Sequence, residues 1–299
     1  MALGGNPIFN GKNFRGATQA PRVPQAPFGQ AQYGQQPYGQ RAPGQVMDPQ
    51  NGWGQQQNMT DEQLREMYNQ PAAGPADTGR MTYDDVIVKT AACLGVLLAG
   101  AAVTMFVSMG LASILMIVGA LGGFVLALVN TFKKQPSPAL ILAYAGLEGL
   151  FLGGLTRVLD LMYPGVGLQA VIGTLSVFTV TLLLFKSGKV RASPKAMKFF
   201  MIAMVGYGLF SVVNLVMMMT GLQTGMFGMR SGIIGVVIGI LAIGLAAFSL
   251  VMDFTSIEAG VQSGAPQRFS WTAAFGLTVT LVWLYVEIIR VLAILRGED

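Results

Sequence analysis

From residue 84 onward, the chain alternates long apolar runs with short polar connections. Crossing the hydrocarbon core of a bilayer takes about 20 apolar residues. Seven runs have that length, at residues 86–107, 111–132, 139–160, 166–185, 199–220, 231–255 and 272–294. The chain is 53% hydrophobic and only 11% charged, whereas soluble domains carry about a quarter charged residues. The sequence therefore predicts an all-α, polytopic membrane protein, with seven transmembrane helices in a domain of residues 81–299.

Residues 1–80 have a different composition from the rest of the chain. They are rich in Gln, Gly, Pro and Tyr, as in AQYGQQPYGQRAPGQ, and lack the short apolar run of a cleavable signal peptide. Their apolar content is too low to offset the entropy lost on ordering. We therefore expect a disordered N-terminal tail.

The distribution of Lys and Arg predicts the orientation of the spans. With seven spans, one side receives most of the basic residues: Arg80, Lys89, Lys133, Lys134, Lys186, Lys189, Arg191, Lys195, Lys198 and Arg268. The connections on the other side hold little more than Arg157 and Arg230. Because basic loops stay in the cytoplasm, we expect a cytoplasmic N-terminus and an external C-terminus. The same loops account for the net charge of +5, so no nucleic-acid partner is expected.

The residue content excludes several classes of enzyme. The chain has no His and one Cys, Cys93, which rules out Ser-His and Cys-His nucleophile pairs and His-ligated zinc. No Gly-Lys-Ser/Thr phosphate loop is present, and the seventh run has no Lys to carry retinal. We expect neither catalysis nor a cofactor nor a bound metal.

Two acidic residues lie in the last two runs, where a charge is costly and marks function by default. Asp253 and Glu287 are on consecutive helices, so their carboxyls are candidates to face each other and share a proton. In the alternative interpretation, Asp253 faces interfacial water and Arg290 neutralises Glu287 from position i+3. The two acids differ in their depth in the membrane, because Glu287 lies about 24 Å along a helix that starts at Trp271. The acids meet only if that helix begins below the bilayer.

Other polar residues within the runs are candidates for an ion path or for structural support. Glu148 either lines a cation path or forms a hydrogen bond between helices in its protonated form. Asn214 is expected to donate a hydrogen bond between helices.

The segments SLVMDFTSIEAG and LYVEIIRVLAILRG, Asn214 in VVNLV, and the basic step Lys133-Lys134 occur in this order. In this combination, residues 80–297 resemble the Bax inhibitor-1 family of transmembrane proteins, in its bacterial form, to which the tail is an addition. The resemblance implies six helices around a central seventh, in the bacterial cytoplasmic membrane. It also implies a pH-sensitive cation leak, chiefly of calcium, controlled by Asp253 and Glu287. Lys133 or Lys134 is then the nearest match to a basic latch of the closed state.

Two further functions stay open. The first alternative to an ion leak is a membrane scaffold or stress-response factor that binds protein partners through its tail. The second is a proton-coupled transporter. Loss of partner recruitment on deletion of residues 1–78 would support the scaffold. Saturable substrate uptake would support the transporter.

Overall fold

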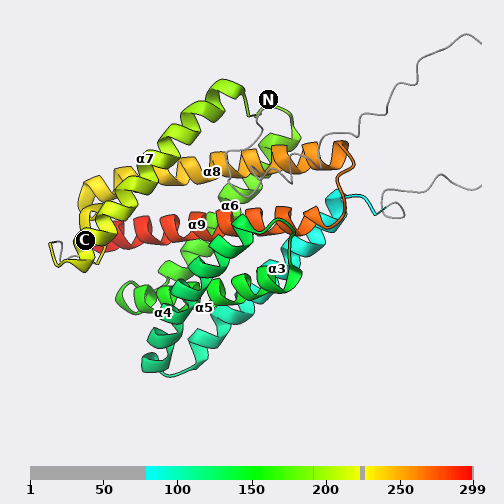
Figure 1. Cartoon of the computed structure of the whole chain (residues 1–299). Helices are drawn as coiled ribbons and strands as arrows, with labels where there is room; N and C mark the ends of the chain where they lie inside the picture. The colour runs from blue at the N-terminus through cyan, green and yellow to red at the C-terminus, as the bar shows by residue number, and fades with distance from the viewer. Residues whose placement is uncertain (1–78, 191, 223–225, 298–299) are drawn as a thin grey trace, which may run out of the picture. The chain divides into compact units, whose positions relative to one another are not determined.

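The computed structural model describes residues 79–190, 192–222 and 226–297. Within these ranges, seven helices are long and apolar enough to cross a membrane (Figure 1). They are α3 (Tyr83–Phe106), α4 (Met109–Phe132), α5 (Pro138–Met162), α6 (Val166–Lys186), α7 (Pro194–Met219), α8 (Gly232–Gln262) and α9 (Phe269–Gly297), with a short 3₁₀ helix η2 (Gly228–Arg230) before α8. The predicted seven-helix, all-α membrane fold is confirmed. The tail predicted to be disordered lies outside the described residues.

The helix ends follow local sequence signals. Thr82 precedes α3 and accepts a hydrogen bond from the Asp85 backbone N–H at 3.1 Å, as an N-cap residue does. The largest departure from the sequence-based bounds is at α8, which continues seven residues past the predicted end at 255. It stops before Gly264, whose φ of +65° breaks the helix.

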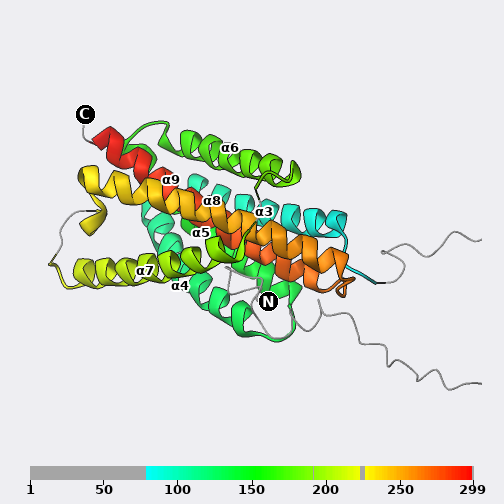
Figure 2. The same ribbon diagram turned by 90° about the horizontal axis from the view of Figure 1, so that it is seen from above.

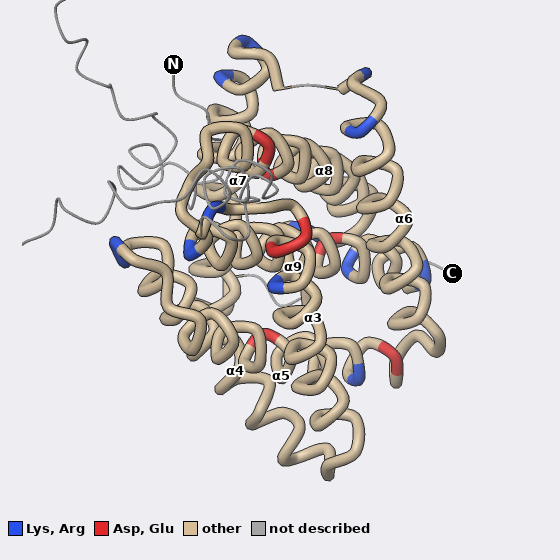
Figure 3. The backbone as a smooth tube through the Cα atoms, turned by 90° about the vertical axis from the view of Figure 1, so that its right-hand side faces the viewer, with Lys and Arg blue, Asp and Glu red and all other residues tan. Residues whose placement is uncertain are grey.

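Helix α9 lies at the centre of the other six. In the end-on view of Figure 3, α7 and α8 lie on one side of it, α6 beside it and α3 to α5 on the remaining sides. Figure 2 shows α6 and α7 on opposite sides of the α8–α9 pair. In α9, 20 of 29 residues are buried. This confirms the expected arrangement of six helices around a central seventh.

Helix α7 is mostly exposed, in contrast to α9. Only two of its 26 residues, Phe200 and Asn214, are buried. Most of its apolar side chains are on the outside, where a bilayer would surround them. Its inward contacts are concentrated near α8 and η2. The helix is therefore attached to the bundle by a small number of interactions.

Glycines allow α3 and α5 to approach closely. A Cβ atom at Gly149 would lie 2.1 Å from the carbonyl oxygen of Leu97, and one at Gly153 would lie 2.4 Å from that of Ala101. Real Cβ atoms do not come so near to a backbone. Small residues are therefore required along this interface, as in other tightly packed membrane helices.

The two ends of the bundle have different connections. At the end where α3 begins, the N-terminal end, Met81 N–H donates to the Ala265 carbonyl at 2.7 Å and Gln267 N–H donates to Gly79 at 2.8 Å. At the opposite end, the Arg157 guanidinium donates to the carbonyls of Thr104 and Val107 at 2.7 and 2.6 Å. Figure 3 looks onto the N-terminal end and marks Lys and Arg in blue. The predicted basic connections belong to this end, except for Arg191, which lies outside the described residues.

Candidate functional site

Asp253 is fully buried in α8. Its Oδ2 accepts a hydrogen bond from the hydroxyl of Thr280 in α9 at 2.7 Å. Thr280 precedes Glu287 by seven residues, which is about 10 Å along a helix. The structure therefore joins Asp253 to Thr280, and the sharing of a proton between Asp253 and Glu287 stays a prediction.

The α8–α9 hairpin explains this separation. In an antiparallel pair of helices, residues at similar distances from the connecting turn lie side by side. Asp253 lies nine residues before the end of α8, and Thr280 lies eleven residues after the start of α9. Glu287 lies eighteen residues after that start. The difference in depth noted from the sequence is real, and starting α9 at Phe269 does not remove it.

Glu287 is 2% exposed and has polar partners from three elements. Arg290 forms an ion pair with it from position i+3, and Arg290 Nη1 donates to Oε1 at 3.3 Å. The Tyr207 hydroxyl of α7 donates to Oε1, and Trp283 Nε1 donates to the same oxygen at 3.3 Å. Arg230 Nη1 lies 3.7 Å from Oε1. The geometry agrees with one part of the alternative interpretation, that Arg290 neutralises Glu287. The other part is wrong, because Asp253 is buried and does not face interfacial water.

Arg230 is the residue that sequence reasoning missed, because it was placed in an outer connection. Its guanidinium lies 4.9 Å from the ring centre of Tyr207 and 5.6 Å from that of Phe210. Its Nη2 donates to the hydroxyl of Ser211. Tyr207, Ser211 and Asn214 follow one another at helical spacing on the inward stripe of α7. That spacing was the available signal for this face.

Asn214 fixes the segment that precedes α8. Its Oδ1 accepts from the Met229 backbone N–H at 2.7 Å, and its Nδ2 donates to the Phe227 carbonyl at 3.3 Å. The expected hydrogen bond between helices is thus made to η2 and its flanking loop.

We call Tyr207, Ser211, Arg230, Glu287 and Arg290 the arginine cluster.

A cavity of about 360 Å³ adjoins the arginine cluster. Its wall includes Met116 of α4, Phe151 and Leu155 of α5, Asn214 of α7, Arg230 of η2 and Arg290 of α9. Two arginines and one asparagine therefore line a space whose other lining residues are apolar.

Glu148 lies in a separate environment, between α5 and α4. It is 9% exposed. A Cβ atom at Gly123 of α4 would lie 2.8 Å from its Oε1, so the carboxyl rests against the α4 backbone. Tyr144, one turn earlier in α5, is its polar neighbour. Among the described residues, no Lys or Arg forms an ion pair with Glu148.

The candidate latch residues lie at the surface. Lys133 and Lys134 follow α4 at the N-terminal end and are both exposed. The partners given above for Asp253 and Glu287 include neither lysine. Their role as a latch of the closed state stays a prediction.

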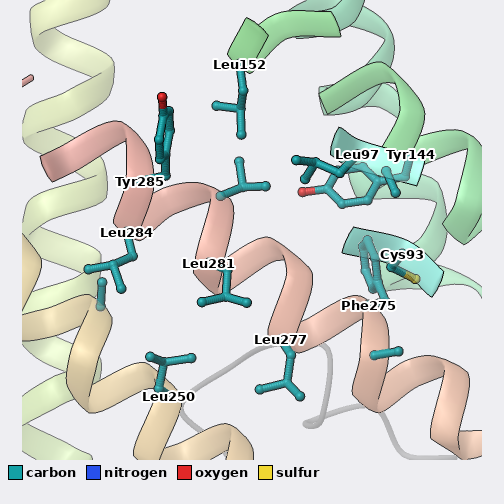
Figure 4. Close-up of a cluster of buried hydrophobic side chains, with 14 of the residues drawn as sticks. Cys93, Leu97, Tyr144, Leu152, Leu250, Phe275, Leu277, Leu281, Leu284 and Tyr285 are labelled. Carbon is teal, nitrogen blue, oxygen red and sulfur yellow. The ribbon is translucent and has the colours of Figure 1, made fainter. Parts of the chain in front are cut away.

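A groove of about 430 Å³ is lined by residues of α3, α5, α6 and α9. Figure 4 shows Leu97, Leu152, Leu281 and Tyr285, which belong to its wall. The hydroxyls of Tyr285 and Thr156 lie 2.7 Å apart at this wall. The described part of the chain contains no group of three or more His, Cys, Asp or Glu residues placed to hold a metal ion.

Comparison with known proteins places the chain in a family. The sequence model of the family described as Bax inhibitor 1 like matches residues 6–297, nearly the whole chain. A search of curated proteins gave no match. The family match begins at residue 6 and not near 80, so it takes in most of the segment that the resemblance had left outside. The chain therefore belongs to the Bax inhibitor 1 like family of integral membrane proteins.

Proposed function

We propose that this protein is a pH-sensitive cation leak channel with calcium as its chief ion. The observation that carries the proposal is that Asp253 and Glu287 are both buried in the helical core, at 0% and 2% exposure. Ionisable groups at this depth are costly and mark ion paths and proton switches. The expected setting is a bacterial cytoplasmic membrane, with the N-terminus in the cytoplasm. No catalytic role is proposed.

The conformation described here corresponds to a closed state. Arg230 and Arg290 line the cavity beside Glu287, and two guanidinium groups against one carboxylate leave an excess positive charge. Such a charge repels divalent cations strongly where the dielectric constant is low. Conduction therefore requires the arginine cluster to rearrange.

Protonation of Glu287 supplies a way to rearrange it. A neutral Glu287 no longer attracts Arg290 or Arg230, and its hydrogen bond from Tyr207 weakens. That hydrogen bond is one of the few ties between α7 and the centre of the bundle. Acidification therefore shifts α7 between two positions, which is a population shift driven by one proton.

Asp253 acts as a second, separate switch in this scheme. Its protonation changes the hydrogen bond that joins α8 to α9 through Thr280. Because Thr280, the donor to Asp253, lies about 10 Å along α9 from Glu287, the scheme treats the two acids as two switches and not as one shared-proton pair. Lys133 and Lys134 act as a latch only if α4 moves toward the buried acids, which Lys133→Gln and Lys134→Gln test.

Calcium flux into proteoliposomes, measured from pH 5 to pH 8, tests the proposal. We expect flux from the purified protein with a pH-dependent transition. Asp253→Asn and Glu287→Gln should each remove part of that dependence, and the double variant should remove all of it. A shared-proton pair would instead lose all dependence in either single variant. No ion flux at any pH would reject the channel function.

The second candidate function is recruitment of protein partners through the tail. The observation that favours it is the family match to residues 6–297, which includes most of the tail. Deleting residues 1–78 separates the two functions. Flux that persists while recruitment is lost would make the tail an interaction segment of the channel, and saturable substrate uptake would instead support a proton-coupled transporter.

A further inference from the structure

The arginine cluster has more positive than negative charge. Among the described residues, the ion pairs of Arg230 and Arg290 both go to one acid, Glu287. Arg290 is 5% exposed, and the side chain of Arg230 is 13% exposed. Within the described residues, one unit of positive charge is therefore left without a partner. Burying an unpaired charge costs several kcal/mol, so a compensating negative group is expected nearby.

The hydrogen-bonding capacity of the two arginines is also incomplete. The Nε atoms of Arg230 and Arg290 are buried and have no hydrogen-bond partner within the described part of the chain. Buried N–H donors are normally satisfied, and guanidinium donors bind anions best, through charge-assisted hydrogen bonds. The donors without a hydrogen-bond partner and the excess positive charge are therefore on the same two side chains, Arg230 and Arg290.

Space for an anion is present at this position. The cavity of about 360 Å³ is lined by both arginines and by Asn214. It is roomy enough for a halide or a short carboxylate, because one water takes about 30 Å³ of liquid volume. The rest of the wall is apolar, with Phe151, Leu155 and Val286 among its residues. Such a wall lowers the dielectric constant and strengthens attraction to a small anion.

We propose that the cavity beside Arg230 and Arg290 is a binding site for a small monovalent anion, either a halide or a short-chain carboxylate. The anion neutralises the excess charge and occupies the free guanidinium donors. It thereby stabilises the packing of α7 and η2 against α9. The site does not depend on cation conduction, so it stands or falls separately from the channel function.

Bromide is the probe for the test. The full chain in lipid nanodiscs is heated in sodium bromide and in sodium gluconate at equal ionic strength, since gluconate is larger and more polar. We expect the unfolding midpoint to rise saturably by about 5 °C in bromide. Crystals of the full chain grown in bromide should show an anomalous peak within about 4 Å of the Arg290 guanidinium. Equal midpoints in both salts, together with no such peak, would overturn the proposal.

Two variants of Ser211 separate the site from general salt effects. Ser211 is the residue whose hydroxyl contacts Arg230, so Ser211→Asp places a carboxylate where the anion is needed. We expect this variant to lose the bromide-induced rise, while Ser211→Asn keeps it. Arg230→Gln removes the excess charge and should also lose the rise. Lys198→Gln, at the exposed N-terminal end, serves as a surface-charge control. A full bromide response in Ser211→Asp would contradict the proposal even if Arg230→Gln fails to fold.

Discussion

Two glutamates lie in the interior of the bundle, and their surroundings differ. Glu287 of α9 has two guanidinium groups, a tyrosine hydroxyl and an indole N–H as partners. Glu148 of α5 rests against Gly123 of α4 and has Tyr144 as its polar neighbour. Both are almost fully buried. Burial alone therefore does not decide what a buried acid does.

The polar partners of each buried glutamate determine its role. A carboxyl with two arginines is most stable as a carboxylate and holds separate segments together. A carboxyl without a cationic partner is most stable in its neutral form, where it donates one hydrogen bond and packs like an amide. Glu287 thus joins α7, η2 and α9 through charge, whereas Glu148 contributes to the contact between α4 and α5 through shape.

Removing each carboxylate gives the largest expected contrast. Glu287→Gln leaves two buried arginines without their shared partner and should lower the free energy of unfolding by about 3–5 kcal/mol. Glu148→Gln keeps shape and a polar group and should cost less than about 1 kcal/mol. Thermal or denaturant unfolding in nanodiscs measures both. Equal losses would show that the two glutamates do not differ in charge.

The tyrosines beside the two acids give a second contrast. Tyr207→Phe removes a hydrogen bond to a charged acceptor and should cost about 2 kcal/mol. Tyr144→Phe is the matched change next to a neutral carboxyl and should cost about 1 kcal/mol or less. The same unfolding assay applies. A larger effect at Tyr144 would reverse the comparison.

A smaller effect is expected from crowding Glu148. Gly123→Ala places a methyl group 2.8 Å from Glu148 Oε1, and moving that flexible carboxyl should cost about 1 kcal/mol. Gly146→Ala is the control, because its nearest neighbour is an atom of Val96 at 3.6 Å. Combining Gly123→Ala with Glu148→Ala, which removes the carboxyl, shows whether the carboxyl is the group displaced. Independent effects of the two changes would argue against contact between Glu148 and Gly123.

The smallest expected effect is the coupling between Asp253 and Glu287. Because Asp253 pairs with Thr280, about 10 Å from Glu287 along the helix, their substitutions should add within about 0.5 kcal/mol. A double-mutant cycle with Asp253→Asn and Glu287→Gln measures this term. A coupling above about 1 kcal/mol would restore the carboxyl pair.

The fold was predictable because hydropathy fixes the number of spans and their alternation. The end of α8 was less predictable, since the apolar run stops at residue 255 whereas α8 continues to Gln262. The site was only partly predictable. Arg290 lies one turn from Glu287 and was found by local spacing. Arg230 reaches Glu287 from a connection 57 residues away, and packing between distant segments leaves no periodic signal in one sequence.

The ionisation of the two glutamates at neutral pH is the claim most directly open to measurement. Infrared spectroscopy detects the C=O stretch of a protonated carboxylic acid separately from that of a carboxylate. We predict a protonated-acid band at pH 7 that loses intensity in Glu148→Gln and is unchanged in Glu287→Gln. A band that is unchanged in Glu148→Gln and loses intensity in Glu287→Gln would contradict the account.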